Sequence, residues 1–230
     1  MMLPRAGADR GSTRRAGVLR RHGFARGDYH DARWTGFGAL RVLDELELAT
    51  QAEEPAAVYA NMLLLWWPLS GTLHWRSEGA APLAVQPGML LAASAGHGLR
   101  WSLHNPASTP LRALEFWLQP LHSNLTPQHH LRATAAAPAG WTLLAAAADQ
   151  AHGDALPLPA AARLRVWRAA GDEHGLLEGV AARVWLQVTR GALMVGPQVL
   201  TAGDGLGVEP ATTLPLRALE PCEALALELS

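Results

Sequence analysis

Short apolar runs separated by turn residues are the feature that most constrains how this chain can fold. Residues 83–106 read LAVQPGMLLAASAGHGLRWSLHNP, in which Pro-Gly, Ser-Ala-Gly and Asn-Pro turns bound runs of strand length. Similar runs occur at 62–67, 72–75 and 111–118, with Gly or Pro close behind each. Runs this short, with turns at regular spacing, are typical of an all-β barrel or sandwich.

The second half of the chain repeats the pattern of the first. Residues 65–73, LWWPLSGTL, resemble residues 185–193, WLQVTRGAL, and residues 85–89 resemble residues 200–204. Each copy reads as a strand, a turn containing Gly and a further strand. Internal repetition on this scale indicates duplication of a β-domain.

The duplication predicts an all-β chain with two barrels. We expect the first barrel in residues 1–122 and the second in residues 161–230, where the strand pattern returns. Residues 123–160 lack that pattern and are Ala-rich, so we interpret them as a connector.

Charge and composition exclude several classes of protein. The chain has 19 Lys and Arg against 20 Asp and Glu, which gives no overall field to attract nucleic acid or an anionic membrane. The arginines between residues 10 and 26 are interpreted as a solvated edge. A single cysteine, Cys222, excludes an intrachain disulfide and a thiolate metal cluster. Without a signal-peptide pattern or an apolar run of membrane-spanning length, we expect a soluble cytoplasmic protein.

Several motifs together resemble the pirin family of quercetinase-like bicupins. They are FARGDYHD at 24–31, GFGALRVLDE at 36–45, SAGHGLR at 94–100, and Asn105-Pro106. The resemblance covers nearly the whole chain and is weakest at 121–163. It implies two cupin barrels, each a double-stranded β-helix or jelly roll.

The resemblance also implies a metal site in the first barrel, made of His-x-His, a later His and a Glu two residues after it. Alternate residues of a strand share a face, and such ligands suit a divalent iron-like ion. Here the His-x-His positions fall on Ala57 and Tyr59, and the later pair falls on Trp101 and Leu103. The Glu that follows His-x-His in other cupins falls on Leu63. None of these ligands is present, so we expect no metal or other cofactor, and a pocket at the five vacated positions.

The vacated site allows two outcomes, a filled core or a smaller apolar pocket that binds a small molecule. Of the nine tryptophans, Trp66, Trp67, Trp75, Trp101 and Trp117 lie on the expected strands of the first barrel and add apolar volume there. A replacement polar site made from His74, His97 and His104 is an alternative, but we expect these histidines to be separate.

Three functions stay open at this point. We favour a metal-free bicupin that is not an enzyme and that binds either a small apolar ligand or a protein partner in a regulatory role. The alternative is a metal-dependent oxidoreductase resembling quercetin 2,3-dioxygenase. A metal-independent isomerase or lyase that uses Tyr59 is the third.

Overall fold

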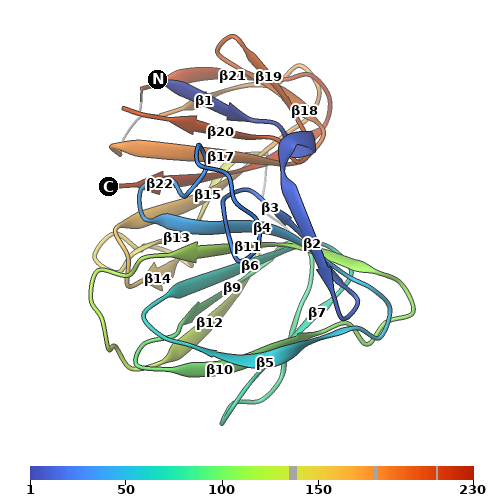
Figure 1. The fold of residues 1–230 in the computed structure, drawn as a ribbon. Coiled ribbons are helices and arrows are strands. Elements are labelled where there is room, and N and C mark those ends of the chain that lie inside the picture. Colours follow the sequence, from blue (N-terminus) through green and yellow to red (C-terminus); the bar gives the residue numbers. More distant parts are fainter. Residues whose placement is uncertain (135–138, 179–180, 211) are drawn as a thin grey trace. The chain divides into compact units, whose positions relative to one another are not determined.

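The computed structural model describes residues 1–134, 139–178, 181–210 and 212–230. Within them the chain is built from β-strands and one short 3₁₀ helix, η1 (Gly7–Asp9), which confirms the expected all-β class (Figure 1). The internal contacts divide the chain into two compact units. We call the unit of Gly11–Ala135 and Leu158–Ala160 the first barrel, and the unit of Met1–Arg10, Ala136–Pro157 and Ala161–Ser230 the second barrel.

The first barrel contains a seven-stranded sheet and a four-stranded sheet, and neighbouring strands in both are antiparallel. The strand orders are β12-β9-β6-β11-β4-β3-β2 and β5-β10-β7-β8. Their bounds are β2 (Gly11–Arg15), β3 (Val18–His22), β4 (Leu40–Leu48), β5 (Glu53–Tyr59), β6 (Leu63–Ser70), β7 (Leu73–Ser77), β8 (Leu83–Val85), β9 (Met89–Ser94), β10 (Leu99–His104), β11 (Leu111–Leu118) and β12 (Gln128–Ala133).

The core of the first barrel follows from strand alternation. On β4, Val42, Leu46 and Leu48 face a single buried cluster, and on β11 Ala113 and Trp117 face the same cluster. Alternate side chains of a strand point to one face, so each strand supplies every second residue. Burial of these apolar side chains is the main favourable contribution to folding.

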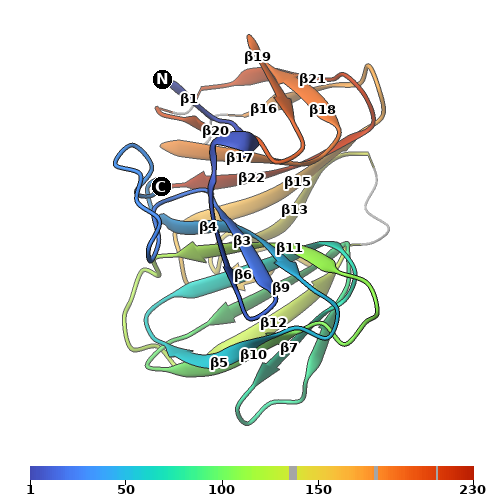
Figure 2. The same cartoon turned by 45° about the vertical axis from the view of Figure 1, so that its right-hand side comes forward.

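The second barrel also has a seven-stranded and a four-stranded sheet, ordered β1-β20-β17-β22-β15-β13-β14 and β16-β21-β18-β19 (Figure 2). Its strands are β1 (Met2–Arg5), β13 (Gly140–Ala147), β14 (Leu156–Leu158), β15 (Ala162–Ala169), β16 (His174–Leu177), β17 (Arg183–Arg190), β18 (Ala192–Val195), β19 (Gln198–Thr201), β20 (Gly205–Val208), β21 (Leu214–Ala218) and β22 (Cys222–Leu229). Its core cluster takes side chains from both sheets.

The segment interpreted as a connector, residues 123–160, contains strands. β12 pairs with β9 of the first barrel, and β13 pairs with β15 of the second. The contacts also group Met1–Arg10 with the second barrel, because β1 pairs with β20. The boundaries drawn at residues 122 and 161 stay a prediction.

Matching glycine turns support the internal repeat. Gly71 and Gly191 occupy equivalent places in the two copies and have φ values of 75° and 70°. A Cβ on Gly71 would lie 2.7 Å from the Leu111 Cβ, and one on Gly191 would lie 2.3 Å from the Pro221 carbonyl oxygen. Both turns therefore require glycine.

No helix in the described part of the chain is long and apolar enough to cross a bilayer.

Candidate functional site in the first barrel

Strands β5 and β10 carry four of the five positions expected to line the vacated site. They pair antiparallel, with Leu99 opposite Tyr59 and Trp101 opposite Ala57, and the register then shifts before Leu103. Directly opposite residues share a face of the sheet, so Tyr59, Ala57, Trp101 and Leu103 are brought together. Trp101 is 2 % exposed and Leu103 is fully buried.

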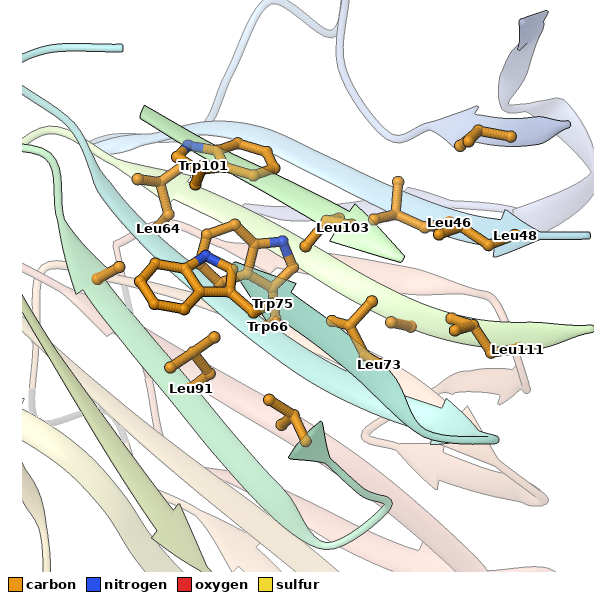
Figure 3. Close-up of a cluster of buried hydrophobic side chains, with 14 of the residues drawn as sticks. Leu46, Leu48, Leu64, Trp66, Leu73, Trp75, Leu91, Trp101, Leu103 and Leu111 are labelled. Carbon is orange, nitrogen blue, oxygen red and sulfur yellow. The ribbon is translucent and has the colours of Figure 1, made fainter. Parts of the chain in front are cut away.

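Aromatic rings fill the space around Trp101. The ring of Tyr59 stacks on Trp101 at 5.7 Å and meets the edge of Trp117 at 4.6 Å. Trp66 meets Trp101 edge-on at 5.0 Å and lies 6.4 Å from Trp75. Figure 3 shows Trp66, Trp75 and Trp101 close together, with Leu103 beside them. We call Tyr59, Trp66, Trp75, Trp101 and Trp117 the aromatic cluster; such pairs add about 0.5–1.5 kcal/mol each beyond area burial.

Leu63 does not join the other four positions. It is buried, but the core cluster contains its neighbours Leu64 and Trp66. Consecutive residues of a strand face opposite sides, so Leu63 on β6 faces away from the aromatic cluster.

A buried group of charged side chains lies next to the aromatic cluster. Glu115 of β11 is fully buried, and it accepts hydrogen bonds from Arg20 Nη1 at 2.7 Å, Arg26 Nη1 at 3.1 Å and Trp66 Nε1 at 3.0 Å. The Arg26 guanidinium also lies 4.3 Å from the centre of the Trp117 ring. The cation–π contact joins the charged group to the aromatic rings.

The remaining members of this group balance its charge. Asp44 of β4, also fully buried, accepts from Arg26 Nη1 at 2.6 Å and pairs with His22 Nδ1 at 2.8 Å. Glu54 pairs with Arg20 through both carboxylate oxygens. We call Arg20, Arg26, Asp44, Glu54 and Glu115, with His22, the charged network.

Burial and pairing act in opposite directions on the acids of the network. Burial would raise the pKa of Asp44, but the hydrogen bond to His22 and the charges of Arg26 and Arg20 lower it below its usual range. Burial raises the pKa of Glu54, and the charge of Arg20 counteracts this only in part. For Arg20, burial would lower the pKa, but the neighbouring carboxylates of Glu115 and Glu54 raise it.

Sequence reasoning missed this network and treated its arginines as solvated. The Arg20 side chain is 12 % exposed and lies within ion-pair distance of three carboxylates. One signal was present: Asp44 lies between Val42 and Leu46, and Glu115 lies between Ala113 and Trp117, at the apolar positions of their strands. Charges at inward positions are seldom buried unless they are paired.

A cavity of about 360 Å³ opens beside two of the expected pocket residues. Strands β2 and β3 with their turn supply one side and β5 the other, including Arg15, Val18, Arg20, Glu54, Ala57 and Tyr59. Trp101 and Leu103 do not line it. The cavity therefore has apolar walls and the Arg20–Glu54 ion pair at its surface.

Two of the three histidines of the alternative polar site lie close together, and the third, His97, lies apart from them. His74 and His104 are opposite each other on β7 and β10, with ring centres 6.4 Å apart, on the face away from the aromatic cluster. Partial burial, followed by the charges of His104 and Arg76, lowers the pKa of His74. His97 is exposed in the turn before β10, so the length of that strand separates it from His104.

The residues present do not fit a divalent metal ion. At the positions that the resemblance assigns to ligands, Ala57 and Leu103 have no donor atom, Trp101 has only an N–H, and Tyr59 has a single phenol. In the described residues, no group of three or more His, Cys, Asp or Glu is placed to hold a metal. The nearby carboxylates of Glu115 and Asp44 are already occupied by arginines.

Comparison with known proteins gives one family model and full-length relatives. A model described as the quercetinase C-terminal cupin domain matches residues 144–229. A quercetin 2,3-dioxygenase of Escherichia coli K12 is 26 % identical over 231 residues, which cover 100 % of this chain and 99 % of the relative. A pirin-like protein of Caulobacter vibrioides is 25 % identical over 90 % of each chain.

Two solved structures of a bacterial pirin from Escherichia coli match this chain over its whole length. The crystal structure of YhhW from Escherichia coli matches with a TM-score of 0.94 and 26 % identity, over 100 % of this chain and 98 % of that one. The structure of the same bacterial pirin in complex with nickel(II) matches with a TM-score of 0.93 over 100 % and 99 %. The chain is therefore similar over its whole length to quercetin 2,3-dioxygenases and pirin-like proteins, and its residues 144–229 match a quercetinase C-terminal cupin domain.

Proposed function

We propose that this chain is a metal-free pirin-family protein whose first barrel binds a small molecule and does not catalyse dioxygenation. The observation that carries the proposal is the contact of Trp101 with Tyr59 and Trp66, at ring-centre distances of 5.7 and 5.0 Å. An indole in contact with two other aromatic rings occupies volume that an imidazole and a metal ion would need. It supplies no lone pair for coordination.

The charged network supports the same proposal. A metal ion beside the network would face the guanidinium groups of Arg20 and Arg26, which are held 2.7 and 3.1 Å from Glu115. The three carboxylates of the network already pair with Arg20 or Arg26, so a metal ion would have to displace a guanidinium group to reach them. The same arginines neutralise the interior carboxylates, so these carboxylates do not require a metal ion.

The cavity beside Ala57 and Tyr59 is the part of the first barrel that favours small-molecule binding. Its volume of about 360 Å³ lies within the range of ordinary ligand pockets, roughly 300–1,000 Å³. Val18, Ala57 and the Tyr59 ring give it apolar walls. We propose a small ligand with an apolar body as the occupant.

Metal analysis tests the proposal directly. The purified chain and the Escherichia coli relative are incubated with iron(II) or nickel(II), dialysed, and measured by elemental mass spectrometry. We expect less than one metal per ten chains here and stoichiometric nickel on the relative. Stoichiometric metal that persists in a His74→Ala, His104→Ala variant, which removes the outer histidine pair, would overturn the proposal.

A rebuilt site provides the matched variant. Ala57→His, Tyr59→His, Trp101→His and Leu103→Glu together restore the ligand types that the resemblance implies, and this variant is expected to take up nickel where the parent does not. Loss of quercetin absorbance and consumption of oxygen are followed for both. Turnover by the unmodified chain, supported by a bound metal, would favour the alternative of a metal-dependent dioxygenase.

A further inference from the structure

The second barrel contains a cavity that is independent of the first barrel and of the metal question. It has a volume of about 590 Å³. Its walls combine apolar side chains with two charged ones, chiefly Trp141, Leu176, Pro215, Leu216, Arg165 and Glu178. Apolar walls with a few convergent polar groups are the usual composition of a small-molecule site.

Trp141 is a rigid wall of this cavity. It lies opposite Trp167 across β13 and β15, and the two rings are 6.3 Å apart. Its indole Nε1 donates a hydrogen bond of 2.8 Å to the carbonyl oxygen of Leu176. Because the indole is held at both its ring and its nitrogen, it presents a fixed surface on which a planar group can pack.

Arg165 gives the cavity a buried positive charge. It is 6 % exposed, and its guanidinium carbon lies 4.5 Å from the centre of the Trp141 ring. Arg165 pairs with Glu228, which is 2 % exposed, and its Nε finds no hydrogen-bond partner among the residues that the structure describes. A guanidinium has five N–H donors, so one buried carboxylate leaves donors available.

Glu178 is the group that a ligand would replace. Its carboxylate lies 3.7 Å from Arg165 Nη1, which is too long for a hydrogen bond, and its side chain is 58 % exposed. An exposed carboxylate in this position contributes little to stability and can move into solvent. A ligand carboxylate at the same place would gain a shorter, charge-assisted contact.

We propose that the second barrel binds a small aromatic carboxylate, whose ring packs against Trp141 and Leu176 and whose carboxylate displaces Glu178 from Arg165. The apolar walls select for the ring, and Arg165 selects for the negative charge. A bare divalent cation is disfavoured, because Glu228 is already paired and Arg165 faces the cavity.

Titration calorimetry with 1-naphthoate tests this proposal, with uncharged 1-naphthylmethanol as the matched probe. We expect saturable binding of one naphthoate per chain and binding of the alcohol at least about tenfold weaker, since a charge-assisted hydrogen bond is lost. Equal affinity for the two probes, or no saturable binding at millimolar naphthoate, would overturn it.

Variants assign the binding to this cavity. Glu178→Gln removes the competing carboxylate and is expected to tighten naphthoate binding about two- to fivefold, the range of an exposed ion pair. Glu220→Gln removes an exposed carboxylate outside the cavity and is expected to leave the affinity unchanged. Trp141→Leu should weaken binding of both probes. Arg165→Met should abolish the preference for naphthoate, but this variant can fail to fold because Arg165 is buried. Glu178 is exposed, so Glu178→Gln tests the proposal without that difficulty. An unchanged or weaker affinity for naphthoate in Glu178→Gln would refute the proposal.

Discussion

Substitution of Glu115 by Gln tests whether the charged network holds the first barrel together. Gln has nearly the shape of Glu, so the variant removes a negative charge and leaves no cavity. The Glu115 carboxylate is fully buried and accepts from Arg20 at 2.7 Å and Arg26 at 3.1 Å through the same oxygen, Oε2. The other oxygen accepts from Trp66 Nε1 at 3.0 Å.

The size of the effect follows from these contacts. A net contribution of about 1.5–3 kcal/mol is typical of one hydrogen bond to a charged group, and two such bonds lose their charge here. Arg20 keeps Glu54 and Asp44 as partners, and Arg26 keeps Asp44, so part of the loss is offset. The Gln oxygen can still accept from Trp66. We therefore expect Glu115→Gln to lower the free energy of unfolding by about 2–4 kcal/mol.

Urea denaturation measures the change, and amide hydrogen exchange assigns it to the first barrel. Exchange is needed because the chain has two compact units that can unfold separately. The control is Glu47→Gln, whose carboxylate is 31 % exposed and 3.4 Å from Arg21, and for which we expect a loss below about 0.5 kcal/mol. A loss for Glu115→Gln as small as that of the control, or full protection of the β11 amides, would refute the reasoning.

Three further predictions concern the same barrel. The pKa of Asp44 is lowered in the folded chain, so the stability that its ionised carboxylate contributes is present above its ordinary pKa of about 3.9 and is lost as the pH falls below that value. Asp44→Asn should therefore lower the free energy of unfolding by about 3 kcal/mol at pH 7. In the variant, the urea concentration at the unfolding midpoint should also fall less steeply as the pH is lowered. The pKa of Glu54 is raised in the folded chain, so ionisation of this carboxyl lowers stability as the pH rises above its ordinary pKa of about 4.3. Glu54→Gln should therefore change the free energy of unfolding by less than about 1 kcal/mol at pH 7. A loss as large as that of Glu115→Gln would contradict the raised pKa of Glu54. Trp101→Ala should lower stability by about 3–5 kcal/mol in thermal or urea unfolding, whereas the same change at the more exposed Trp34 should cost less, and equal losses would contradict close packing at Trp101.

Strands of the first barrel could be predicted from the sequence where an apolar run is closed directly by turn residues. The run 111–118 coincides with β11, and the run that begins at Leu99 coincides with the start of β10, because a turn residue closes each run. The resemblance assigned Ala57 and Trp101 to one site, and the structure places them opposite each other on β5 and β10. The resemblance assigned Leu63 to the same site, whereas the structure turns its side chain to the other face of β6, because the face changes with every residue of a strand.

The charged network and the strands of the connector depend on partners that are distant in the sequence. Arg20 and Glu115 are separated by 95 residues, and the sequence around either residue does not indicate that the other is its partner. β12 and β13 are poor in alternating β-branched residues, and each is a strand because a neighbouring sheet edge supplies its hydrogen bonds.

The pairing of β1 with β20 has a consequence for biosynthesis. Met2 lies opposite Val208 and Arg5 opposite Gly205, so β1 joins a strand that the ribosome makes about two hundred residues later. A ribosome releases the first residues long before the last, and loop closure over about two hundred residues is slow compared with closing a hairpin. Until residues 205–208 emerge, β1 has no edge to pair with, and until β1 arrives the outer edge of β20 is open to other chains. The sheet of the second barrel is therefore complete only after β20, which is made about two hundred residues after β1, has left the ribosome.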